Sequence, residues 1–372
     1  MILGVDTSTY FESKKFGSRY FKNGQEVEPL DIFRDNGVSL MRIRVWKNPY
    51  DENGKPYLGG TCDYANYIKL AKLAISKGYK IVLDPHFSDF WCDPHKQMMP
   101  KGWESLSENE LLSALEEYAH KLFVDSKNDG VYPSYIQLGN EITSGTLWPY
   151  AKVDGDLPRQ GYDKLIKVLK IISKEARDIF PEAKLIIHLE RSFDNAIYRE
   201  FFDNVIPEVD FDVIGMSYYP YWHKTMKHLF ANVDDLKKRY SKEIMIVEVG
   251  YGFTLEDYVK EALDDSSLVI TQDMINSNDA KIEFPLTPEG QKAFLDTLLP
   301  LAKAHGISGI IYWEPIWIPG EGICWASKEG QKYINELKGG TRNEWANQCL
   351  FDYSGNALPA LDSFKITKEG TK

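Results

Sequence analysis

The sequence predicts an α/β fold, a closed (β/α)8 TIM barrel that forms a single domain over residues 1–372. Apolar runs that are typical of strands alternate eight times with helical patterns, at intervals of roughly thirty to fifty residues. Polar and aromatic residues gather after each strand, where barrel enzymes carry their active sites. A doubly wound open sheet is the competing fold, but no glycine-rich phosphate loop follows the first strand.

The first half of the chain supplies four strands with helices between them. Short apolar or alternating runs predict strands at 2–6, 38–46, 80–83 and 135–141. Helix signals lie between these runs: a glycine closes 31–37, an aspartate opens 63–78, and a Ser-x-x-Glu capping box opens a helix from 107 to about 123.

The second half repeats this order. Strands are expected at 185–190, 213–216, 244–248 and 309–313. The intervening helices are expected at 161–180, which a proline stops, at 196–204, at 232–240, and at 287–306, which opens with Thr-Pro and closes with glycine.

Two strands end in a glutamate. Tyr135, Gln137, Gly139 and Glu141 share one face of the fourth strand, and Glu248 ends the seventh. A carboxylate at the end of a buried strand needs a partner or a chemical task. A salt bridge explains either glutamate alone, but two carboxylates across a barrel mouth are what cleavage of a glycosidic bond requires.

Neighbouring residues complete this hypothesis. Glu141 is expected to act as acid/base with a raised pKa and Glu248 as ionised nucleophile, about 5 Å apart, which predicts retention of anomeric configuration. Arg44 would keep Glu248 charged and Tyr218 would orient it. Asn140 is placed to bind the sugar 2-hydroxyl. Trp313 would stack under the sugar at the cleavage point.

Composition favours a neutral, ring-shaped ligand. The net charge of −11 disfavours nucleic acid and anionic membrane surfaces, and no apolar run is long enough for a membrane span. Aromatic residues make up 13 % of the chain, which is consistent with a sugar-binding groove; a large core with surface aromatics is the alternative explanation. The four cysteines lack metal-ligand spacing and are expected to be free or buried thiols.

Two further expectations concern the compartment and the oligomeric state. The chain starts directly with a strand pattern and shows no signal leader, so we expect a cytoplasmic protein, or a secreted one whose leader is absent from this sequence. We also expect a monomer.

In its ordered motifs the chain resembles glycoside hydrolase family 53, the endo-β-1,4-galactanases of clan A. The resemblance runs from Gly4 to about Phe364, and the matching segments are 4–8, 42–50, 84–94, 136–141 with 147–149, 217–223 and 312–315. It implies a retaining endo-hydrolase of the β-1,4-galactan side chains of pectin, without a cofactor for catalysis. The substrate-binding residues that we predict are Arg44, Trp46, Asp84, His86, Trp91, Asn140, Tyr218, Trp222 and Trp313.

The sequence departs from the family pattern at two strand ends. The family motif E-T-A-Y-P reads Glu248-Val249-Gly250-Tyr251-Gly252 here, and H-x-D-N reads His188-Leu189-Glu190-Arg191. Bacterial members often hold a structural calcium ion in the loop after the seventh strand. That loop offers oxygen ligands without the spacing of a calcium loop, so we assign no metal ligands; the candidates are Asp264, Asp265, Asn276, Asn278 and Asp279.

Two alternatives stay open. The barrel could act on β-glucan, mannan or xylan, because sequence does not show whether the cleft is curved enough for galactan. It could also be a carbohydrate-binding protein that has lost its chemistry, although a pure binder has no use for two opposed carboxylates.

Overall fold

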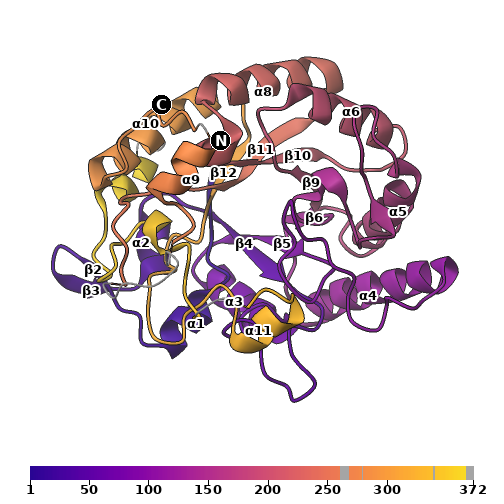
Figure 1. Ribbon diagram of the computed structural model, residues 1–372, viewed down its shortest axis with the longest axis horizontal. Helices are drawn as coiled ribbons and strands as arrows, with labels where there is room; N and C mark the ends of the chain where they lie inside the picture. The colour runs from indigo at the N-terminus through magenta and orange to yellow at the C-terminus, as the bar shows by residue number, and fades with distance from the viewer. Residues whose placement is uncertain (260–267, 279, 338–339, 366–372) are drawn as a thin grey trace.

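A computed structural model describes residues 1–259, 268–278, 280–337 and 340–365. Eight parallel strands close into a barrel, and helices surround it (Figure 1). The order around the barrel follows the chain, so each strand lies beside its sequence neighbours. The barrel strands are β1 (Ile2–Asp6), β4 (Leu40–Val45), β5 (Lys80–Pro85), β6 (Tyr135–Gln137), β9 (Lys184–Leu189), β10 (Val213–Tyr218), β11 (Glu243–Val249) and β12 (Gly309–Trp313). The predicted fold and all eight predicted strands are confirmed.

Helices connect successive strands and cover their outer faces. The longer ones are α3 (Tyr64–Ser76), α4 (Glu108–Asn128), α5 (Tyr162–Ile179), α6 (Asn195–Val205), α8 (Met226–Tyr240) and α10 (Pro288–Ala304). Shorter ones are α1 (Tyr10–Lys15), α2 (Pro29–Asp35), α7 (Pro220–His223), α9 (Gln272–Ser277) and α11 (Lys328–Tyr333). Two hairpins, β2 (Tyr20–Lys22) with β3 (Gln25–Val27) and β7 (Gly145–Thr146) with β8 (Ala151–Lys152), lie outside the barrel sheet.

The helix starts follow the capping signals in the sequence. Ser107 and Glu110 form the predicted capping box of α4, and the side chain of Thr287 caps α10, whose first residue is a proline. The helix expected at 232–240 begins earlier, at Met226, because Thr225 is the extended residue before it and the apolar face starts at Met226.

The apolar interior consists of two clusters. The larger one lies between the strands and the helices. The smaller one fills the barrel and contains residues of all eight strands: Ile2, Leu40, Val82, Tyr135, Ile186, Val213, Met245, Val247 and Ile311. Residues two positions further along several of these strands are polar, so the inward-facing layer next to this cluster is built of charged and amide side chains.

The described helices include none that is long and apolar enough to cross a membrane. The four cysteines are buried free thiols, as the sequence predicts.

Candidate active site

Glu141 reaches the barrel mouth through a break in strand geometry. The expected strand 135–141 is shorter than predicted, because β6 ends at Gln137 and the backbone then turns through positive φ at Gly139 (115°) and Glu141 (50°). A left-handed glutamate is uncommon, and such strain is concentrated at functional sites. As a result, Asn140 and Glu141 both take part in the polar network of the mouth instead of facing opposite sides of a sheet.

Glu248 reaches the same place through a β-bulge. Met245 and Val247 both belong to the cluster inside the barrel, so strict alternation would turn Glu248 outward. The pairing of β10 with β11 shifts here: Met216 pairs with Ile246, but Ser217 pairs with Glu248. The extra residue changes the alternation and directs Glu248 inward.

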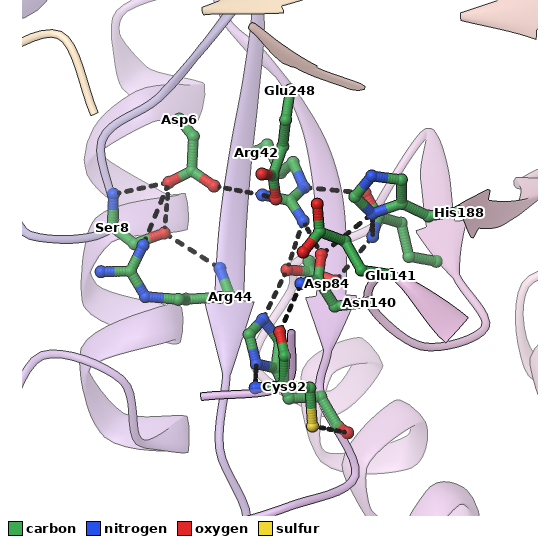
Figure 2. A network of polar contacts seen from close by, with 12 residues as sticks. Asp6, Ser8, Arg42, Arg44, Asp84, Cys92, Asn140, Glu141, His188 and Glu248 are labelled. Carbon is green, nitrogen blue, oxygen red and sulfur yellow. Dashed lines mark hydrogen bonds and ion pairs between the residues drawn. The ribbon is translucent and has the colours of Figure 1, made fainter. Parts of the chain in front are cut away.

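Glu141 and Glu248 therefore meet at the ends of the fourth and seventh barrel strands. Figure 2 shows the two carboxyl groups pointing toward one another. Ser217 lies between their strands: it pairs with Glu248 along the sheet, and its Oγ is 2.5 Å from Glu141 Oε1. Both glutamates are buried, with 8 % and 6 % of their surface exposed.

Arg42, on β4, is the cation beneath the two glutamates. Its Nη1 contacts Glu248 Oε1 at 3.0 Å and Asp6 Oδ2 at 2.8 Å, and its Nη2 contacts Asp84 Oδ2 at 2.8 Å (Figure 2). The guanidinium also donates to the side-chain oxygens of Gln137 (2.7 Å) and Asn140 (2.6 Å). Arg42 thus orients Glu248 and holds three carboxylates together.

The prediction that Arg44 keeps Glu248 charged is wrong. Arg44 faces the same side of β4 but lies one layer higher, where its Nη1 pairs with Glu314 at 2.6 Å and its Nε donates to Cys62 Sγ at 3.2 Å. Its guanidinium lies over the ring of Trp91, 4.3 Å from the centroid. Period-two alternation places both arginines inward and does not tell which layer meets β11.

The prediction that Tyr218 orients Glu248 is also wrong. Tyr219 does so, because its hydroxyl donates to Glu248 Oε2 at 2.9 Å. Tyr218 follows the inward-facing Ser217 and points to the outside of the barrel, where its ring stacks on Phe294 of α10 and its hydroxyl donates to the carbonyl of Lys224. Alternation along β10 therefore separates the two neighbouring tyrosines.

The environments of the two glutamates differ in charge. Burial raises the pKa of Glu141 well above its ordinary value, and the nearby Glu248 and Glu190 raise it further. Burial also raises the pKa of Glu248, to about 7, but Arg42 and the hydrogen bond from Tyr219 oppose that rise. Glu248 is therefore the group that ionises first, and Glu141 is the group that keeps its proton.

Asp84, His86 and Trp46 form a buried series of contacts beside Arg42. Asp84 is fully buried, and Arg42 and His86 outweigh the effect of burial and hold its pKa at about 2. His86 Nε2 lies 3.1 Å from Asp84, and its Nδ1 accepts from the indole of Trp46 at 3.2 Å. His86 and Trp46 are 2 % and 0 % exposed, so neither presents an open face to a ligand, contrary to the prediction that both bind the substrate.

Aromatic side chains surround the mouth. Trp313 is half-buried, with its ring edge-to-face against Trp345 (4.6 Å between centroids), and Trp222 is exposed beside Tyr219 and Tyr221. Trp91 is almost fully buried and donates its indole N–H to the carbonyl of Trp325. Trp222 and Trp313 thus have free ring surface for stacking on a sugar.

At each of the two departures from the family pattern, the structure shows a hydrogen bond made by the residue that differs. The backbone N–H of Gly252 donates to the hydroxyl of Tyr221 at 2.5 Å, a bond that a proline at this position could not make. The carboxylate of Glu190 accepts from the Thr143 hydroxyl at 2.6 Å and so fixes the turn after Glu141. Gly252 and Glu190 are buried, whereas Arg191 is exposed.

Sequence reasoning missed four functional side chains: Arg42, Gln137, Ser217 and Tyr219. Period-two alternation was the available signal, because Arg42 and Gln137 lie two positions, Ser217 four positions and Tyr219 six positions after an inward apolar residue. The roles that we assign to the site residues remain predictions.

No group of three or more His, Cys, Asp or Glu side chains within the described part of the chain could hold a metal ion. Of the calcium candidates, Asn276 lies in α9 and accepts from Gln272, and Asn278 follows that helix. Asp264, Asp265 and Asp279 lie outside the described residues.

A (β/α)8 barrel with two facing, buried carboxylates on its fourth and seventh strands has the fold and site of a glycoside hydrolase. The chain belongs to glycosyl hydrolase family 53, whose model matches residues 2–364.

Individual relatives agree with this assignment. The chain is 35 % identical to the family 53 catalytic domain of Ignisphaera aggregans, with a TM-score of 0.85 over 98 % of this chain and 95 % of that one. It is 27 % identical to a fungal β-1,4-galactanase, with a TM-score of 0.76 over 98 % and 99 % of the two chains. It is 28 % identical to the endo-β-1,4-galactanase of Bacillus subtilis, over 99 % of this chain and 86 % of the relative.

Proposed function

We propose that this protein is a retaining endo-β-1,4-galactanase that hydrolyses the galactan side chains of pectin. The observation that carries the proposal is the pair of facing carboxylates with opposite environments, one held by Arg42 and Tyr219 and the other beside Ser217. The substrate follows from membership in family 53 together with the activity named for the Bacillus subtilis and fungal relatives.

The chemistry divides into two displacements. In the first, Glu248 attacks the anomeric carbon while Glu141 donates its proton to the leaving oxygen, which gives a covalent glycosyl-enzyme. In the second, Glu141 takes a proton from water, and the water attacks the same carbon and releases Glu248. Asn140 is nearly buried and its amide is already bonded to Arg42 and Cys92, so it presents one fixed edge to the sugar 2-hydroxyl.

No cofactor enters these steps. The monomeric state expected from the sequence belongs to the same proposal, and so does the expectation of a cytoplasmic protein or of a secreted one whose leader is absent from this sequence. We assign no ligands to a structural calcium ion.

Release of reducing ends from β-1,4-galactan tests the proposal, with mannan, xylan and β-glucan measured in parallel. The matched blank is Glu141→Gln, which keeps the shape of the side chain and removes the acid. We expect hydrolysis of galactan alone, and a variant that binds galacto-oligosaccharides without turning them over.

If the protein hydrolysed mannan, xylan or β-glucan instead, the proposed mechanism would stand and the proposed substrate would be wrong. Oligosaccharide binding by a wild-type protein that cleaves none of the four would identify a carbohydrate-binding barrel instead.

A further inference from the structure

A chain of three short contacts runs inward from Glu141. Glu141 Oε1 lies 2.5 Å from Ser217 Oγ, Ser217 Oγ lies 2.8 Å from His188 Nε2, and His188 Nδ1 lies 2.9 Å from Asn140 Oδ1. His188 and Ser217 are completely buried, so water does not complete these contacts. The proposed two-step reaction assigns no role to either residue.

Asn140 Oδ1, the atom at the inner end of this chain of contacts, can only accept hydrogen bonds. Arg42 Nη2, which is always a donor, contacts Asn140 Oδ1 at 2.6 Å, and Asn140 Nδ2 donates to the carbonyl of Cys92 at 2.8 Å. These two partners fix the orientation of the amide. Asn140 Oδ1 is therefore an acceptor toward His188, and it supplies no proton to the chain.

His188 supplies one proton. Burial and the neighbouring Arg42 lower the pKa of His188 well below its ordinary value, so the imidazole is neutral and carries a single N–H. At 2.9 Å from an acceptor, Nδ1 must carry that hydrogen. The second candidate partner of Nδ1, Gln137 Nε2, is at 3.3 Å and already donates to Asp84 Oδ1 at 2.8 Å. Nε2 is then a bare acceptor, and the Ser217 hydroxyl donates to it.

Counting protons gives the state of Glu141. Three contacts need three protons, and the neutral imidazole and the serine hydroxyl supply two. The third can come only from a protonated Glu141 that donates to Ser217 Oγ. With Glu141 ionised, one contact brings two lone pairs together in a buried place, which costs free energy.

We infer that Ser217 and His188 are positioning residues that hold Glu141 in its acid form between turnovers, through a hydrogen-bond chain anchored on Asn140. The inference rests on the proposed function, in which Glu141 must be protonated when the substrate arrives. The chain gives a task to the buried side chains of His188 and Ser217, which connect the acid catalyst to Asn140.

Other charged and titratable groups shift the pKa values of Glu141 and His188, and none of these groups is mutated in the tests of this inference. Those that act on Glu141 are Glu248 from β11, Glu190 at the end of β9, and Asp93 after β5, with the phenols of Tyr198 and Tyr219 close enough to feel its charge. Those that act on His188 are Arg42, Asp84, His86 and His223.

The tautomer of His188 is measured first, because it needs no turnover. Nitrogen-15 NMR of the wild-type protein labelled at histidine, with His188→Asn to assign the resonance, separates a protonated from a bare ring nitrogen. We expect a protonated Nδ1 and a bare Nε2. A protonated Nε2 overturns the inference whether or not the protein cleaves galactan.

The direction of a pKa change gives the second test. Ser217→Ala removes the acceptor for the Glu141 proton, so the pKa of Glu141 and the alkaline limb of kcat/KM on galactan should fall by about one pH unit. His188→Asn should act in the same direction, because the freed Ser217 hydroxyl can then donate to the carboxylate. Carbon-13 NMR titration measures the pKa of Glu141 directly, so it tests the same shift even in a variant that no longer cleaves galactan.

The matched control is Ser126→Ala, which also removes a buried serine hydroxyl, here one bonded to Tyr67 and to the carbonyl of Val131 on the outside of the barrel. Its alkaline limb should equal that of the wild type. An unchanged limb in Ser217→Ala would show that Ser217 only fills space, and a raised limb would show that it donates to an ionised Glu141. Either result overturns the inference.

Discussion

Removing the Tyr219 hydroxyl isolates one of the two donors that stabilise ionised Glu248. In Tyr219→Phe the ring keeps its edge-to-face contact with Trp345, 5.2 Å between centroids, and only the 2.9 Å bond to Glu248 Oε2 is lost. A hydrogen bond to a charged acceptor contributes about 1.5–3 kcal/mol. Because 1.36 kcal/mol corresponds to one pKa unit, the pKa of Glu248 should rise by about one to two units.

The sign of the effect on activity follows from the role of Glu248. The nucleophile must be ionised, so activity is lost as the pH falls through its pKa, and a higher pKa moves this acid limb upward. The assay is the pH dependence of kcat/KM on β-1,4-galactan. At a pH below the acid limbs of both the wild type and the variant, a pKa of Glu248 that is one unit higher lowers kcat/KM tenfold.

Tyr218→Phe is the control, because it makes the same chemical change one residue away on the outer face of β10. Its acid limb should match that of the wild type. An unmoved limb in Tyr219→Phe, or an equal movement in both variants, would refute the assignment of Tyr219 as the residue that orients Glu248.

Three further predictions address the nucleophile, the central cation and metal dependence. Glu248→Ala should abolish hydrolysis, and azide should partly restore it with inverted configuration in the product; polarimetry or NMR of the product decides, and retained activity without azide would contradict the nucleophile assignment. Arg42→Met leaves buried carboxylates without their cation and should lower the free energy of unfolding by about 3–5 kcal/mol in urea. The control Arg199→Met removes a partly exposed ion pair and should cost no more than about 1 kcal/mol; equal losses would argue against the central role of Arg42. A chelator should leave turnover unchanged at constant folding, as judged by circular dichroism, and a fall in turnover of the folded protein would reveal a catalytic metal.

Much of the fold could be predicted because its signals are local. Helix caps, terminal glycines and alternating apolar runs each involve a few neighbouring residues, and the eight strands follow from them. The two glutamates could be predicted for the same reason, since each follows directly on an apolar strand pattern.

The partners of the glutamates depend on features that are not local. Arg42 and Arg44 are equivalent under period-two alternation, and only the stagger of neighbouring strands in the closed barrel decides which one meets Glu248. The bulge in β11 and the positive φ of Glu141 are backbone irregularities that no residue type in those stretches demands. Sequence reasoning therefore located the two facing glutamates and misplaced two of their neighbours.

The cluster around Arg42 also determines the kind of sugar that suits the cleavage point. The guanidinium of Arg42 faces the carboxylates of Asp6, Asp84 and Glu248, and Arg44, one layer higher, pairs with Glu314. Negative charge is thus in excess in a buried place, where its field is weakly screened. This field favours the positive charge that develops on the sugar ring during cleavage, and equally a sugar mimic with a cationic ring nitrogen. It opposes a uronic acid at the same point, so a polymer that carries both neutral and acidic sugars should be cut in its neutral branches and spared in its acidic backbone.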